Sequence, residues 1–235
     1  MILLNAALLT VLLSTARGTQ EAQVFEAEIT KTVRMGYLLH LPANYDAGGT
    51  SYPLILFLHG SGRRGDDIEQ VSGYAIPKIA EEQDDFPFIA VSPQCPAQSF
   101  WQPELEAVEA LMVDVIETYN VDESRICLTG NSMGGFGSWA LAIRNPGLFA
   151  AVAPICGGGD PDTVAILKDV PVWNFHGAKD AAVDPEQSQA MVDALEAAGG
   201  DVKYTLYPNL GHDSWTVTYA NPELYEWFLS HRKGE

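Results

Sequence analysis

Cysteine is scarce in this sequence, with three residues in a chain of 235, so the cysteines cannot all pair. Cys127 lies inside an apolar stretch, which favours a buried small hydrophobe. Cys95 and Cys156 each end an apolar run, and one disulfide bridge between them would suit an oxidising compartment. Neither a C-x-x-C nor an H-E-x-x-H pattern occurs. We therefore expect no metal centre and no cofactor.

Positive charge is also scarce, because 13 Lys and Arg stand against 31 Asp and Glu, for a net charge of −18. Such a surface repels nucleic acid and anionic membranes, which excludes polyanionic partners. Hydrophobic residues make up 47% and charged residues 19%, a globular composition rather than that of a disordered chain or a coiled coil. No repeat, low-complexity segment or linker divides the chain, so we expect residues 19–235 to form one domain.

An uncharged segment, residues 1–16, opens the chain, and residues 2–13 are nearly all apolar. The run is short for a bilayer span but suits the hydrophobic part of a signal peptide, and the small residues that follow it suit cleavage. No Lys or Arg precedes it, and the alternatives are an apolar segment packed on the domain or a wrongly chosen start. We expect residues 1–18 to be a signal peptide and the mature protein to be secreted or periplasmic, without a membrane span.

Apolar runs without alternation, such as residues 53–58, indicate strands buried on both faces, as in a parallel sheet. The predicted strands are residues 24–32, 35–42, 53–58, 86–91, 126–129, 149–155, 170–175 and 202–207. The predicted helices are residues 66–83, 103–119, 136–144, 185–198 and 217–229. Strands that alternate with helices imply an α/β fold with a mostly parallel, doubly wound sheet flanked by helices.

The motif G-x-S-x-G occurs at Gly130, Ser132 and Gly134, between an apolar strand and a helical segment. At such a strand-to-helix turn the serine adopts a strained conformation, and its neighbours must be small. Five residues of this kind recur by chance as an ordinary turn, so the strand before and the helix after carry the argument. We predict that Ser132 is a nucleophile.

Ser132, Asp180 and His212 follow one another in the order serine, acid, histidine, each just beyond a predicted strand. Open α/β sheets place their sites at these strand ends. His212 would take the serine proton, and Asp180 would orient the imidazole. The competing residues are Asp184 for the acid and His40, His59, His176 and His231 for the base. Asp180 directly follows a strand-ending His-Gly turn, and His212 follows the last strand within Gly-His-Asp, which favours these two.

The strand at residues 53–58 ends in His59-Gly60-Ser61-Gly62. A tetrahedral oxyanion would be held by the backbone N–H of Met133 with that of Ser61 or Gly62. We expect His59 to brace this loop. Arg63 and Arg64 could meet a carboxylate on a substrate, but we favour a role in balancing the acidic surface.

Two tryptophans are candidate substrate contacts, Trp101 and Trp215, because each lies near the end of a predicted strand. The aromatic pair at Phe100 and Trp101 could wall a pocket or equally cap the core. Only a short stretch separates Gly159 from Val170, which leaves no chain for a helical lid there. We expect an open, shallow acyl site.

These motifs resemble the α/β-hydrolase superfamily over nearly all of the mature length, and within it the phospholipase/carboxylesterase-like branch, often labelled predicted peptidase or prolyl-oligopeptidase-like. The motifs are Leu58-His59-Gly60-Ser61-Gly62, Gly130-Asn131-Ser132-Met133-Gly134-Gly135, His176-Gly177-Ala178-Lys179-Asp180, Gly211-His212-Asp213-Ser214-Trp215 and the pattern Trp215, Tyr219, Pro222, Leu224, Tyr225, Trp227. The resemblance implies an α/β-hydrolase fold and carboxylesterase activity on short acyl esters, with Ser132, Asp180 and His212 as the triad.

We therefore expect a serine carboxylesterase that hydrolyses short-chain or small aromatic esters through an acyl-enzyme on Ser132. The alternative is an acetyl or feruloyl esterase acting on plant polysaccharide, which would suit secretion and exposed aromatic residues. A serine peptidase ranks behind both, because such peptidases carry a large extra domain for which this chain is too short. A non-catalytic binding module ranks last, because no triad residue is missing. The expected partner is a small-molecule ester.

Overall fold

A computed structural model describes residues 22–28 and 30–234. The predicted signal peptide, residues 1–18, lies outside the described residues. The chain divides into two units, residues 1–34 and residues 35–235. In the first unit, no described residue belongs to a helix or strand. The predicted strand at residues 24–32 is therefore wrong, because a short strand needs a neighbouring strand to take its backbone hydrogen bonds.

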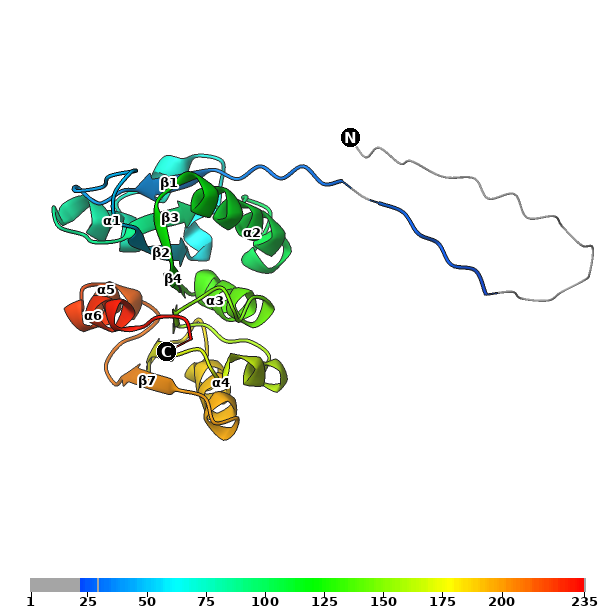
Figure 1. Ribbon diagram of the computed structural model, residues 1–235. Coiled ribbons are helices and arrows are strands. Elements are labelled where there is room, and N and C mark those ends of the chain that lie inside the picture. Colours follow the sequence, from blue (N-terminus) through cyan, green and yellow to red (C-terminus); the bar gives the residue numbers. More distant parts are fainter. Residues whose placement is uncertain (1–21, 29, 235) are drawn as a thin grey trace, which may run out of the picture. The chain divides into compact units, whose positions relative to one another are not determined.

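The second unit contains one seven-stranded sheet with the order β1-β3-β2-β4-β5-β6-β7 (Figure 1). The strands are β1 Tyr37–His40, β2 Tyr52–Leu58, β3 Ile89–Pro93, β4 Val121–Asn131, β5 Ala151–Ile155, β6 Val172–Gly177 and β7 Val202–Tyr207. β1 is antiparallel to β3, and the other neighbours are parallel. This arrangement confirms the predicted mostly parallel sheet. Because Leu58 pairs with Gly130, and Asn131 with Ile155, the carboxyl ends of β2, β4 and β5 meet at one edge.

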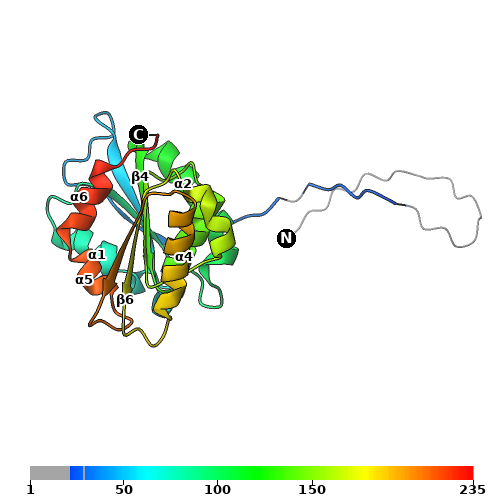
Figure 2. The same cartoon turned by 90° about the horizontal axis from the view of Figure 1, so that it is seen from below.

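Helices cover both faces of the sheet (Figure 2). The α-helices are α1 Ala75–Glu82, α2 Trp101–Thr118, α3 Met133–Arg144, α4 Pro185–Ala197, α5 Trp215–Tyr219 and α6 Pro222–Ser230, and the short 3-10 helices are η1 Ser61–Arg63, η2 Ile68–Gln70 and η3 Pro161–Leu167. α2, α3 and α4 lie on one face, and α1, α5 and α6 on the other (Figures 1 and 2). None of the helices in the described part of the chain has the length and apolarity needed to cross a bilayer.

Each face of the sheet has its own hydrophobic core, because successive side chains of a strand point to opposite faces. In β2, Leu54 and Leu56 pack into the core beneath α2, α3 and α4, whereas Ile55 and Phe57 pack into the core beneath α1, α5 and α6. All four side chains are fully buried. The unbroken apolar run that predicts a central strand is thus shared between two cores.

Two predicted helices are divided in the structure. Residues 66–83 form η2 and α1, because Gly73 (φ 62°) and Ala75 (φ 47°) leave the right-handed helical region. Residues 217–229 belong to α5 and α6, because the Asn221 side chain accepts a hydrogen bond from the Glu223 N–H and Pro222 follows it. This pattern starts a new helix.

All three cysteines are free and buried. The bridge considered between Cys95 and Cys156 is not formed, because the two side chains lie in different cores on opposite faces of the sheet. Cys127 is fully buried in β4, as its apolar surroundings predict.

Candidate active site

Ser132 occupies the turn between β4 and α3, with φ 55° and ψ −120°. A positive φ at a residue with a β-carbon is strained and persists only where the surroundings hold it. Here the Ser132 N–H donates to the Ile155 carbonyl over 2.9 Å, and the Ser132 carbonyl accepts from the Phe136 N–H at 3.1 Å. The turn therefore has the strained geometry that the motif predicts.

Small neighbours are essential to this turn, because backbones approach each other without room for side chains. A β-carbon on Gly130 would lie 2.4 Å from the Gly134 carbonyl oxygen, and one on Gly134 would lie 1.8 Å from the Leu58 carbonyl oxygen. The two glycines thus let the first turn of α3 pass over the end of β2. The serine is left partly exposed at the edge of the sheet.

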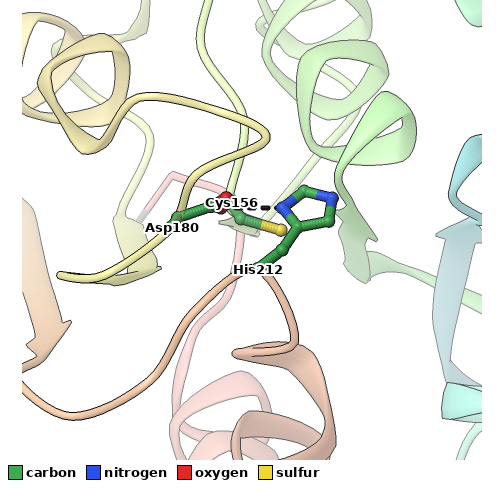
Figure 3. Close-up of side chains that lie close together, drawn as sticks. All are labelled: Cys156, Asp180 and His212. Atoms are coloured by element: carbon green, nitrogen blue, oxygen red, sulfur yellow. Dashed lines mark hydrogen bonds and ion pairs between the residues drawn. The ribbon is translucent and has the colours of Figure 1, made fainter.

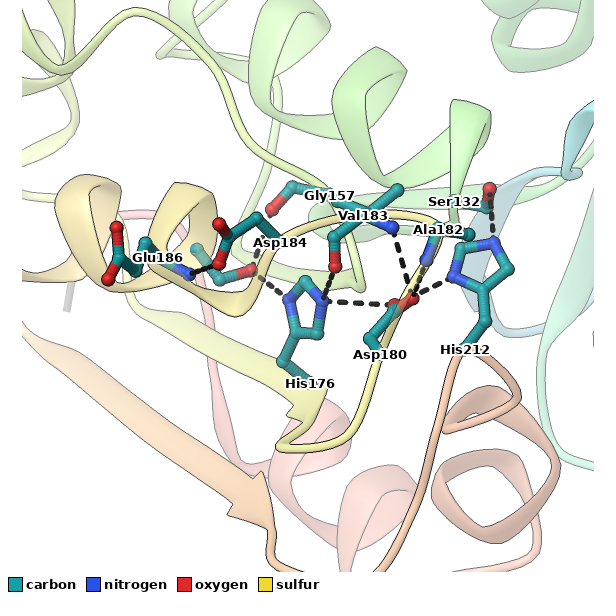
Figure 4. A network of polar contacts seen from close by, with 10 residues as sticks. Ser132, Gly157, His176, Asp180, Ala182, Val183, Asp184, Glu186 and His212 are labelled. Carbon is teal, nitrogen blue, oxygen red and sulfur yellow. Dashed lines mark hydrogen bonds and ion pairs between the residues drawn. The ribbon is translucent and has the colours of Figure 1, made fainter.

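The structure brings Ser132, His212 and Asp180 together in a hydrogen-bonded line (Figure 4). His212 Nε2 lies 2.9 Å from Ser132 Oγ, and His212 Nδ1 lies 2.7 Å from Asp180 Oδ2. A carboxylate only accepts, so Nδ1 carries the hydrogen and Nε2 is left to accept the serine proton. Each residue follows the carboxyl end of a different strand: β4, β7 and β6.

The competing residues lie elsewhere in the polar network or the fold. Asp184 caps α4, where its carboxylate accepts from the Glu186 N–H at 3.0 Å. His231 bonds the Trp227 carbonyl at the end of α6, and His40 belongs to β1. His176 contacts Asp180 but is fully buried at the end of β6.

The Asp180 carboxylate is held by hydrogen bonds on both oxygens. Oδ1 accepts from the Ala182 and Val183 N–H groups at 2.8 and 3.0 Å, and Oδ2 accepts from His212. Burial by itself would raise the pKa of Asp180, but these hydrogen bonds and the neighbouring His212 hold it below its usual value. The carboxylate is therefore ionised at neutral pH.

Backbone donors lie beside Ser132. Met133 opens α3, and the first N–H groups of a helix have no partner within it. Ser61 and Gly62 open η1, and a β-carbon on the preceding Gly60 would lie 3.6 Å from Ser132 Cβ. The predicted oxyanion donors thus belong to two segments next to Ser132, and their role stays a prediction.

The loop after β2 is braced from behind. His59 is fully buried, with Nδ1 2.7 Å from the Gly60 carbonyl and Nε2 accepting from the Cys95 N–H at 3.0 Å. Burial lowers the pKa of His59 to about 4, so the ring stays neutral and bonds as a fixed tautomer. The Arg64 guanidinium donates hydrogen bonds to the Ser61 and Ser99 carbonyls. The Arg63 guanidinium instead lies over the Tyr74 ring, 4.7 Å from its centre.

The two predicted tryptophan contacts differ in the structure. Trp101 is fully buried and donates Nε1–H to the His59 carbonyl over 2.9 Å. The predicted substrate contact of Trp101 is wrong, because its ring belongs to the core between α2 and α3. Trp215 is half-buried, and its ring lies edge-on to His212 with 5.2 Å between centres. Trp215 therefore lies beside the reactive side chains.

Tyr74 lies on the side of the site that Trp215 occupies, and the sequence did not identify it. Its ring lies 6.4 Å from that of Trp215, and its hydroxyl accepts from Asn131 Nδ2 at 2.5 Å. Tyr74 stands in a segment predicted as helix, where no motif marks it. Only the break before α1 turns it toward the residue next to Ser132.

Cys156 lies close to the acid and the base (Figure 3). The potential ligand atoms of Cys156, Asp180 and His212 are all within 4.8 Å of one another. Burial raises the pKa of the Cys156 thiol to about 12, so without a bound ion this side chain is a neutral thiol at neutral pH. Asp180 Oδ2 is already bound to His212 Nδ1.

The parallel sheet, the strained serine turn and the strand-end histidine and aspartate define an α/β-hydrolase fold. The family model of the dienelactone hydrolase family matches residues 11–222. The chain belongs to the dienelactone hydrolase family. The predicted superfamily is thereby confirmed.

Known proteins are similar to part or most of this chain. A putative carboxymethylenebutenolidase of Yersinia pestis is 35% identical over 100 residues, which cover 39% of this chain and 38% of that protein. The bifunctional acetylxylan esterase/xylanase XynS20E of Neocallimastix patriciarum is 25% identical over 184 residues, covering 74% of this chain and 26% of that protein. A thermostable esterase of known structure is 36% identical with a TM-score of 0.77, over 85% of this chain and 60% of that chain. The match therefore spans under two fifths of the first curated relative.

The crowding at Gly134 predicts that Gly134→Ala lowers the free energy of unfolding by about 2–4 kcal/mol, because the new methyl group meets the immobile Leu58 carbonyl. Urea unfolding followed by circular dichroism measures this loss. Gly147→Ala is the matched control, since a β-carbon there meets nothing within 4 Å. Equal stability of the two variants would contradict the close approach.

Proposed function

We propose that this protein is a serine carboxylesterase that hydrolyses short-chain or small aromatic esters through an acyl-enzyme on Ser132. The observation that carries the proposal is the unbroken hydrogen-bonded line from Ser132 through His212 to Asp180. Membership of a hydrolase family and the likeness to a solved esterase support it.

In the proposed mechanism, His212 Nε2 takes the Ser132 proton as Oγ attacks the ester carbonyl carbon. The charge that forms on the carbonyl oxygen is stabilised by the N–H of Met133 and by that of Ser61 or Gly62. Imidazolium then donates its proton to the leaving alcohol, which yields the acyl-enzyme. Water attacks this acyl group with His212 again as the base, and the carboxylic acid leaves. Asp180 orients His212 and stabilises its charge in each step.

The surroundings of the triad support small substrates. The stretch between Gly159 and Val170 forms η3, whose Val164 and Leu167 are fully buried in the core, so this segment does not cover the site as a lid. The His212 side chain is 30% exposed. A partly exposed histidine that η3 does not cover leaves a long acyl chain little surface to bury, so the extra carbons add little binding energy. Export of the enzyme is proposed from residues 1–18 alone.

Replacement of the nucleophile is the direct test. Ser132→Ala should lower kcat for p-nitrophenyl butyrate by about a million-fold, because no acyl-enzyme can form. Ser230→Ala, at an exposed position at the end of α6, is the control and should retain wild-type turnover. Labelling with a fluorophosphonate probe should follow the same pattern. Activity retained in Ser132→Ala would remove the serine from the mechanism, and an unlabelled wild type would favour a binding module.

The open site predicts a preference for short acyl groups. With p-nitrophenyl acetate, butyrate, octanoate and palmitate, kcat/KM should be greatest for acetate or butyrate and fall for the longer chains, because longer chains gain no buried contacts. Assays below the critical micelle concentration of each ester give the comparison. Preference for palmitate would overturn the proposed substrate class while leaving the nucleophile untouched.

A second candidate is an acetyl or feruloyl esterase on plant polysaccharide, favoured by the likeness to a protein named as an acetylxylan esterase/xylanase. Trp215 beside His212, and Tyr74 beside Trp215, are half-buried and provide aromatic surface on which a sugar or feruloyl ring could stack.

This candidate predicts that the wild type, but not Ser132→Ala, releases acetate from acetylated xylo-oligosaccharides or ferulate from feruloylated arabinoxylan fragments. Trp215→Ala should weaken that release more than it weakens hydrolysis of p-nitrophenyl acetate, because the sugar or feruloyl ring is the group proposed to stack on the tryptophan. Chromatography of the released acids measures both. Release of neither acid would remove this candidate.

A further inference from the structure

A second histidine touches the acid of the site. His176 is the penultimate residue of β6, and its side chain is fully buried, as is that of Asp180. Its Nε2 lies 3.1 Å from Asp180 Oδ2, the same oxygen that lies 2.7 Å from His212 Nδ1 (Figure 4). The mechanism above assigns this buried ring no role.

The surroundings of His176 define where its hydrogen lies. Nε2 faces two acceptors, Asp180 Oδ2 and the Val183 carbonyl, both at 3.1 Å. Neither can donate, because a carbonyl has no hydrogen and Asp180 is ionised, its pKa being held low by the hydrogen bonds that outweigh its burial. Nε2 must therefore carry the hydrogen.

The other ring nitrogen meets a group that fits either role. Nδ1 lies 2.7 Å from Ser188 Oγ, which in turn lies 2.6 Å from the Gly157 carbonyl. Burial lowers the pKa of His176, which favours the neutral ring. The Ser188 hydroxyl can then turn its single hydrogen toward Nδ1, whereas with a charged ring it would turn to Gly157 and accept from Nδ1. In both states the Nε2–H bond to Asp180 remains.

We propose that His176 is a positioning residue of the site: its Nε2–H holds the Asp180 carboxylate and limits how strongly that carboxylate retains the proton on His212. This proposal deepens the proposed esterase function and rests on it. Asp180 Oδ2 receives two imidazole N–H groups, and Oδ1 receives two backbone N–H groups. With both oxygens bound, the carboxylate cannot rotate away from His212.

The electrostatic part follows from the shared oxygen. A second donor on Oδ2 offsets part of its negative charge, so the positive charge of protonated His212 is stabilised less. His212 then releases its proton at lower pH and is available as a base. Without His176, Oδ2 would accept from His212 alone and hold the His212 proton more tightly.

Few other charges act on His176. Asp180 from its own loop and His212 from the loop after β7 are the titratable groups that influence it. The segment after β5 contributes the Gly157 carbonyl and the neutral thiol of Cys156. Helix α4 contributes the uncharged Ser188, and Asp184 at its start turns to the Glu186 N–H instead.

The test compares His176→Leu, which removes the donor, with His176→Gln, whose side-chain amide can donate to Asp180 but cannot be charged. In pH profiles of kcat/KM for p-nitrophenyl acetate, we expect His176→Leu to move the midpoint of the acid limb up by about one pH unit. We also expect it to lower the plateau by up to about a hundredfold, because the acid is less well held. His176→Gln should restore most of both. His231→Gln is the control. The His231 ring contacts Ser230 and the Trp227 carbonyl at the end of α6, so its replacement should leave the profile unchanged.

NMR titration of the His212 ring protons gives the same comparison without turnover. The midpoint should rise in His176→Leu relative to wild type and His176→Gln, at a temperature where circular dichroism shows all three folded. An unchanged midpoint in His176→Leu, or an equal loss of activity in both variants without a pH shift, would overturn the proposal. If wild type hydrolyses no ester, the proposed function fails, while the titration still decides the role of His176.

Discussion

The site depends on the close approach of three backbones at the end of β4. The Leu58 carbonyl at the end of β2 lies where a side chain on Gly134 would be, and the Ile155 carbonyl at the end of β5 takes the Ser132 N–H. These contacts hold Ser132 at φ 55°, a conformation that a residue with a β-carbon adopts only when its surroundings enforce it. The central strands therefore determine how the serine is presented, because the register that pairs Leu58 with Gly130 and Asn131 with Ile155 aligns all three backbones.

The polar network that faces the serine comes from separate loops at the same edge of the sheet. Parallel strands end on one side, so the loops after β6 and β7 bring Asp180 and His212 to the turn after β4. Burial of Asp180 would cost free energy if its carboxylate were unpaired. Two backbone N–H groups and two imidazole rings around the carboxylate meet that requirement. Asp180 therefore holds the neighbouring loop and His176 in place as well as orienting His212.

Several sequence interpretations depended only on local chemistry, and these agree with the structure. The apolar run of β2 predicted a buried central strand, because each residue of the run is apolar and so suits a core on either face. The glycines around Ser132 predicted a turn without side chains. The order of Ser132, Asp180 and His212 predicted their meeting, because strand ends in a parallel sheet share one edge. Errors arose where a distant partner decides the outcome, as in residues 24–32, which were predicted as a strand but have no neighbouring strand among the described residues.

The sequence by itself determined the alternation of strands and helices, the strained turn at Ser132 and the residues brought to the carboxyl edge of the sheet. These features follow from hydrophobic periodicity, glycine placement and the order of strands and helices along the chain, which can be read directly from the sequence. Only the tertiary structure decided that Trp101 is a core residue, that Cys95 and Cys156 lie on opposite faces, and that Tyr74 reaches Asn131. It alone showed His176 and His212 on one carboxylate oxygen. The physical reason is that burial and hydrogen-bond partners are set by segments far apart in the chain, whose packing no single stretch of sequence encodes.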